Sequence, residues 1–81
     1  MDKEDIIEIV RNIVSDKFGE ERIKEIDAFG PYEGEDLNIE VVIEGIDERS
    51  TEVNDVLTTL NHKFWDLDLD VPIAINKAEE S

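Results

Sequence analysis

The chain has no cysteine and a single histidine, and it is poor in aromatic and basic side chains. Without cysteine it can form no disulfide, no thiolate zinc site and no cysteine nucleophile. The lone His62 leaves no basis for a Ser-His-Asp constellation. No apolar run reaches membrane-spanning length and the first residues are acidic, so we expect neither a spanning helix nor a signal peptide. These absences favour a cytoplasmic protein.

Acidic side chains dominate what is present. The 81 residues include 23 Asp and Glu against 8 Lys and Arg, for a formal net charge of -15. Such a surface repels nucleic-acid phosphates and attracts divalent cations and basic protein surfaces. We therefore expect no nucleic-acid partner, and either a basic protein partner or a carboxylate shell that only keeps the protein solvated. The sequence does not distinguish a monomer from a homodimer.

Two segments carry the spacing of apolar residues that is typical of an amphipathic helix. Residues 5–18 form the first, between Asp2 as a cap and Gly19 as a stop. The second begins after Ser50 or Thr51 and carries the stripe Val53, Val56, Leu57, Leu60 and Phe64. Trp65 borders this stripe and is expected to cover the core, with contact to a partner as the alternative. His62 lies off the stripe and is expected to be exposed.

Three segments are expected to be strands. Residues 23–29 form a short one and residues 37–44 alternate between apolar and polar, as in a half-buried antiparallel strand. In residues 67–76, acids and aliphatic side chains also alternate, which predicts a third strand. Residues 77–81 are expected to be a flexible tail. The whole chain, 1–81, is then one α+β domain of order α-β-β-α-β, a two-layer sandwich with both helices on one face of a three-stranded sheet. If the last two strands are parallel, their crossover should be right-handed.

The other face of that sheet has no remaining segment to cover it. Asn38, Glu40, Asp68 and Asp70 would share this face, and carboxylates on adjacent strands are close enough to bind one Mg²⁺ or Ca²⁺. A second acidic cluster lies in the connecting loop, which lacks EF-hand spacing; its members are Glu33, Glu35 and Asp36. The row of acids is a cation site, the remnant of a catalytic site, or a solvated edge.

Short motifs in residues 23–75 resemble the minimal nucleotidyltransferases of the antitoxin type. In that family a strand ends in Phe-Gly-Ser, a loop with glycine follows, and the next strand bears Asp-x-Asp before a third acid. Phe29-Gly30 and Gly34 stand where the first two features would be, and residues 37–40, Leu-Asn-Ile-Glu, stand where the acidic motif would be. The resemblance implies that Asp68 or Asp70 is the third acid.

This chain differs from that family at positions that bind the triphosphate and the metal ions. Pro31 replaces the serine that helps to hold the triphosphate, and Asn38 replaces an acid of the two-metal site. The resemblance therefore implies a degenerate member that keeps the scaffold. The cytoplasmic C-terminal domain of cation-diffusion-facilitator transporters has a similar element order, and residues 23–26 and 37–43 look similar to its first strands. The histidines that commonly bind metal there are missing.

Three functions are compatible with these features. The first is a non-enzymatic module, a degenerate nucleotidyltransferase-like domain that acts by binding a protein partner. The second is a divalent-cation-binding domain, either a buffer or a metal-responsive regulator. The third is an active metal-dependent nucleotidyltransferase that uses Glu40 with Asp68 or Asp70. We prefer the first and assign no catalytic residue.

Overall fold

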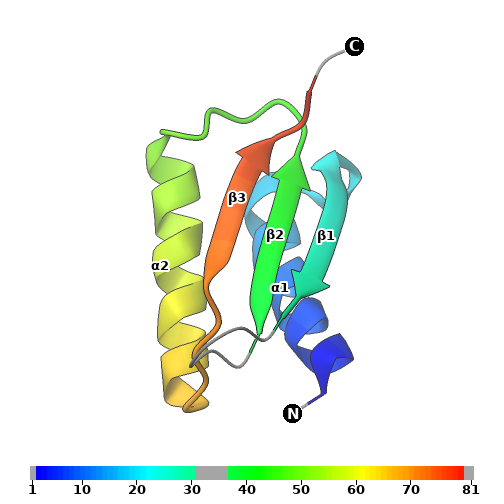
Figure 1. Cartoon of the computed structure of the whole chain (residues 1–81). Coiled ribbons are helices and arrows are strands. Elements are labelled where there is room, and N and C mark those ends of the chain that lie inside the picture. The colour runs from blue at the N-terminus through cyan, green and yellow to red at the C-terminus, as the bar shows by residue number, and fades with distance from the viewer. Residues whose placement is uncertain (1, 31–36, 80–81) are drawn as a thin grey trace.

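The helices and strands follow one another in the predicted order (Figure 1). The structure is a computed structural model, of which residues 2–30 and 37–79 are described. Its elements are helix α1 (Lys3–Phe18), the short 3-10 helix η1 (Glu20–Arg22), strand β1 (Ile23–Phe29), strand β2 (Asn38–Ile43), helix α2 (Thr51–Asp66) and strand β3 (Ile73–Lys77). The α+β class and the order α-β-β-α-β are confirmed.

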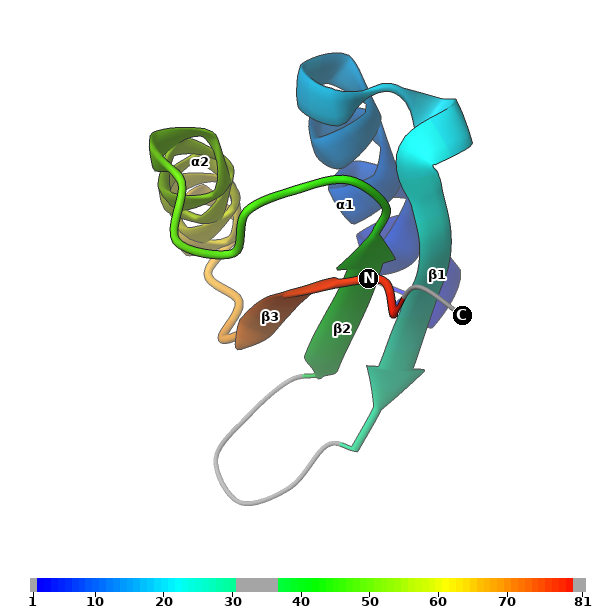
Figure 2. The ribbon, with the colours of Figure 1, turned by 90° about the horizontal axis from the view of Figure 1, so that it is seen from above.

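The central strand of the sheet is β2, because the strand order is β1-β2-β3. It pairs antiparallel with β1 and parallel with β3. Parallel neighbours need a crossover connection, and α2 provides it. Figures 1 and 2 together show α2 behind the sheet while β3 lies to the left of β2. The crossover is therefore right-handed, as expected for this connection.

Both helices cover the same face of the sheet, which Figure 2 shows from above. Alternate side chains of β2 point into this layer, and Ile39, Val41 and Ile43 are almost completely buried. They meet the apolar stripes of the helices, whose most buried members are Val10, Val14, Leu60 and Phe64. The opposite face of the sheet is not covered by either helix. It bears residues of all three strands, among them Asp27, Glu40 and Ala74.

Helix α1 begins two residues earlier than the apolar spacing indicates. The backbone N–H of Asp2 donates to the carboxylate of Asp5 at 3.3 Å, and the Asp2 carbonyl accepts the first helical bonds. The helix ends at Gly19, whose φ of 93° suits a residue without a side chain. The predicted cap and stop are both confirmed.

The third strand is shorter than predicted, and the segment with alternating acids is not part of it. Leu67 ends α2, and Asp68 has a left-handed φ of 59°. The N–H of Asp68 donates to the carbonyl of Trp65, and the N–H of Leu69 to that of Phe64. These two bonds define a Schellman motif, which terminates a helix. The prediction of a strand over residues 67–76 is therefore wrong for the residues before 73. Leu67 and Leu69 belong to the end of α2 instead of a strand.

Strand β3 extends one residue beyond its predicted end at Asn76. Lys77 belongs to β3, and the N–H of Ala78 donates to the carbonyl of Ile43 at 2.9 Å. Of the residues expected to form a flexible tail, 77–81, Lys77 thus belongs to β3, and residues 80 and 81 lie outside the described part. Just beyond the same end of β2, the side chain of Arg22 donates from Nε to the carbonyl of Glu44 at 3.0 Å and from Nη2 to the carbonyl of Gly45 at 2.7 Å. This clamp joins η1 to the turn after β2.

Candidate binding groove

Helix α2 presents an exposed stripe without charge on the side that flanks β3. Its members are spaced like one face of a helix and are Asn54, Thr58, Asn61 and Trp65. Its first turn is fixed by Ser50, whose hydroxyl accepts from the N–H of Val53 at 3.3 Å. The stripe is uncharged along its whole length, in a chain with 38% charged residues.

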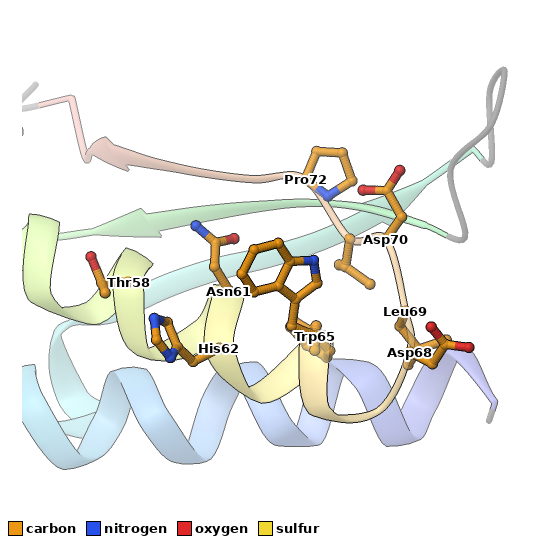
Figure 3. A pocket seen from close by; sticks show the side chains of 10 residues that line it. Thr58, Asn61, His62, Trp65, Asp68, Leu69, Asp70 and Pro72 are labelled. Atoms are coloured by element: carbon orange, nitrogen blue, oxygen red, sulfur yellow. The ribbon is translucent and has the colours of Figure 1, made fainter.

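A hollow of about 720 Å³ lies between the C-terminal half of this stripe and the segment that leads into β3 (Figure 3). Buried Phe64 and Val71 contribute to its apolar lining. Figure 3 shows the indole of Trp65 and the amide of Asn61 pointing from α2 toward the side on which Pro72 lies. The remaining lining residues are Thr58, His62, Asp68, Leu69 and Asp70. The hollow therefore combines an apolar base with polar and acidic sides.

Trp65 does not cover the core, contrary to expectation. Its side chain is 81% exposed, because the apolar stripe of α2 turns inward at Phe64 and leaves the next residue on the outer surface. An exposed indole offers a large apolar face together with one N–H donor. The alternative interpretation, contact with a partner, is the one that agrees with this exposure.

His62 and two acids, Asp68 and Asp70, contribute titratable side chains to the lining of the hollow. His62 is exposed on α2, as expected, and Figure 3 shows its ring pointing away from Asp68 and Asp70. General acid–base catalysis needs a group within hydrogen-bond reach of a reacting atom and, usually, a partner that orients it. We treat the hollow as a binding surface, because an exposed indole beside an apolar base is typical of a contact surface.

The predicted cation residues are not brought onto one strand face. Glu40 is on β2, whereas Asp68 lies in the helix stop and Asp70 in the segment before β3. Asn38 begins β2. Among residues 2–30 and 37–79, no group of three or more His, Asp or Glu side chains is placed to hold a metal ion. The alternative cluster Glu33, Glu35 and Asp36 lies outside the described residues.

The neighbours of Glu40 on the uncovered sheet face come instead from the flanking strands. Asp27 of β1 lies opposite it in the antiparallel pair, and Ala74 of β3 lies beside it in the parallel pair. Like charges directly opposite each other weaken a strand pair. The sequence alone did not pair Asp27 with Glu40, because strand register depends on the connecting turn and on core packing.

One carboxylate has a shifted pKa. Lys24 Nζ lies 2.7 Å from Glu44 Oε2, and its hydrogen bond and positive charge lower the pKa of Glu44, with a further contribution from the charge of Arg22. The pair is exposed and lies at the end of β2, away from the hollow. It joins the bulged start of β1 to the residue after β2, so its role is structural.

No protein-family model, curated protein or solved structure matches this chain. The resemblances to antitoxin-type nucleotidyltransferases and to the transporter domain therefore remain predictions. Within the described residues, no helix has both the length and the apolar character needed to cross a membrane.

The sequence contains one signal for the groove. The spacing of Asn54, Thr58, Asn61 and Trp65 could be read directly beside the apolar stripe. The sequence alone does not indicate which strand lies beside that stripe. Only the parallel pairing of β3 with β2 places an unpaired sheet edge next to α2.

Proposed function

We propose that this chain is a non-enzymatic module that binds a basic protein segment in the groove between α2 and β3. The observation that carries the proposal is the 81% exposure of Trp65 on the margin of a hollow with an apolar base. Exposed aromatic residues beside a pocket are typical of the residues that dominate binding energy at interfaces.

Charge supports the choice of a basic partner. Asp68 and Asp70 lie at the same end of the groove as Trp65, and the whole chain has a net charge of -15. A lysine or arginine side chain can pair with the exposed carboxylate of Asp68 and also lie over the face of the indole. The long-range field of the acidic surface would accelerate its approach.

A peptide-display selection tests this proposal. Random peptides are selected in parallel on the unmodified protein, on Trp65→Ala, and on Phe29→Ala as a matched control. Phe29 is 44% exposed on β1, so its removal deletes another accessible ring at the opposite strand of the sheet. We expect peptides rich in Lys and Arg to be enriched by the unmodified protein and the control. Enrichment that is unchanged by Trp65→Ala, or no enrichment at all, would contradict the proposal.

A further inference from the structure

We infer that the basic segment binds in an extended conformation, as an additional strand on the free edge of β3. This inference rests on the proposed function and specifies how the groove would recognise its partner. Addition of a strand to an exposed sheet edge is a general mode of peptide recognition, in which main-chain hydrogen bonds contribute affinity and neighbouring pockets contribute specificity.

The hydrogen bonds of the sheet identify which backbone groups of β3 face outward. The carbonyl of Pro72 accepts from the N–H of Ile39, and the N–H of Ala78 donates to Ile43. In a parallel ladder the groups that face one neighbour alternate along the strand. Residues 72, 74, 76 and 78 therefore face β2, so the N–H and C=O groups of Ile73 and Ile75 point away from it. β3 has no second neighbour in the described sheet.

The far end of this edge is closed by a side chain of the protein itself. The outward N–H of Lys77 donates to Glu48 Oε2 at 3.2 Å. This contact agrees with the outward direction deduced for the odd-numbered residues of β3. It also leaves Ile73 and Ile75 as the part of the edge on which another strand can pair. Natural edges are often blocked by side chains in this way, and here the block covers only one end.

The uncharged stripe of α2 runs beside this edge. Near the N-terminus of α2, a second hollow of about 310 Å³ is lined by Glu48, Asn54 and Leu57, among others. The first hollow lies at the other end of α2, with Trp65 and Pro72 in its lining. Glu48 contacts the end of β3 and Pro72 precedes its start, so one lining residue of each hollow lies at an end of this edge. An extended segment could lie between α2 and β3 with its side chains in both.

Charge decides between two candidate occupants, a second copy of this chain and a basic segment. Two copies paired through their β3 edges would bring together molecules that each have a net charge of -15. Their repulsion opposes association, most strongly at low salt. A segment with lysines or arginines gains from the same field, and Asp68 lies at the Trp65 end of the edge to receive one of them.

The opposite edge of the sheet offers a comparison within the same molecule. Even-numbered residues of β2 face β1, since the N–H of Glu44 donates to the carbonyl of Arg22. The register then leaves the backbone groups of Ile26 and Ala28 pointing outward from β1. Helix α2 does not flank this edge, because it lies beside β3 (Figure 1). We expect no strand addition here.

Binding of a defined peptide tests the inference. The probe is a capped peptide of alternating lysine and valine, compared with the same peptide N-methylated at its three central residues. Methylation removes backbone donors and keeps every charge and side chain. Trp65 is the only tryptophan, so its fluorescence reports binding directly. We expect the methylated peptide to bind at least about tenfold more weakly, the effect of losing one or two backbone hydrogen bonds.

Matched variants separate the possible failures. Asp68→Asn should weaken binding more than Asp16→Asn, which makes the same charge change on α1. Equal affinities of the two peptides, with the Trp65 fluorescence still changing on binding, would overturn strand addition and leave the proposed function standing. If neither peptide changes the Trp65 signal, both the inference and the proposed function fail.

Discussion

The left-handed conformation of Asp68 predicts opposite effects of glycine and valine at this position. A side chain at the C′ position of a Schellman motif clashes with its own backbone, whereas glycine adopts this conformation freely. Asp68 also places a negative charge next to the negative end of the α2 dipole. Asp68→Gly removes both penalties, and Asp68→Asn removes only the charge.

The magnitudes follow from these two terms. Relief of the left-handed strain is worth about 1–2 kcal/mol, of which up to about 1 kcal/mol is offset by the greater freedom of glycine in the unfolded chain. Removal of the charge adds about 0.3–1 kcal/mol. Asp68→Gly should therefore stabilise the fold by about 1 kcal/mol and raise Tm by about 4–8 °C. Asp68→Asn should stabilise by about 0.5 kcal/mol. Asp68→Val should destabilise by about 1 kcal/mol or more, because a branched side chain fits this conformation worst.

Urea unfolding followed by circular dichroism, at low and high salt, measures all three differences. Salt should remove most of the gain from Asp68→Asn but only about half of the gain from Asp68→Gly, because screening affects only the charge term. If residues 67–71 were an extended strand, valine would stabilise and glycine would destabilise. That order of stabilities would refute the helix-stop interpretation.

Three further predictions concern the clamp, the ion pair and the core. Arg22→Ala should destabilise the fold by about 1–2 kcal/mol, because it removes two hydrogen bonds to main-chain carbonyls. Arg49→Ala, which removes an exposed side chain, should change the stability little. Equal effects of the two substitutions would contradict a stabilising role of the Arg22 clamp. Lys24→Gln should raise the pKa of Glu44, as measured by an NMR titration. Because folding lowers this pKa, the ion pair stabilises the fold at pH values above the pKa of Glu44 in the unfolded chain. This stabilisation should be lost as the pH falls through the pKa of Glu44 in the folded protein. An unchanged titration would argue against the pair in solution. Leu60→Ala should cost about 2–5 kcal/mol by equilibrium unfolding, and a smaller loss would mean that the helix layer repacks.

Local sequence signals predicted the helices and the first two strands, because the spacing of apolar residues in each of them favours one type of element. Helix α1 has both an apolar stripe and end signals, and β2 has a strict alternation that matches its buried residues. The segment after α2 satisfied two patterns at once. Its alternating acids fit a strand, but Leu69 also follows Phe64 at the spacing of a Schellman motif, and that motif forms.

The candidate site was less predictable than the fold, since it depends on contacts between distant residues. Exposure of Trp65 follows from its place just outside the stripe, yet the sequence alone also allowed it to cover the core. The edge of β3 beside α2 arises from the strand order, which no local pattern encodes. The metal prediction depended on extending the third strand through Asp68 and Asp70, so the helix stop removed its geometric basis.

Amide hydrogen exchange measured by NMR tests the central claim most directly. The lysine–valine peptide should slow exchange at Ile73 and Ile75, whose N–H groups gain acceptors when a strand is added. The outward amides of Ile26 and Ala28 at the opposite edge should be unchanged and serve as the internal control. Protection confined to β3 would agree with the account. Equal protection at both edges, or none at Ile73 and Ile75 while the peptide is bound, would contradict it.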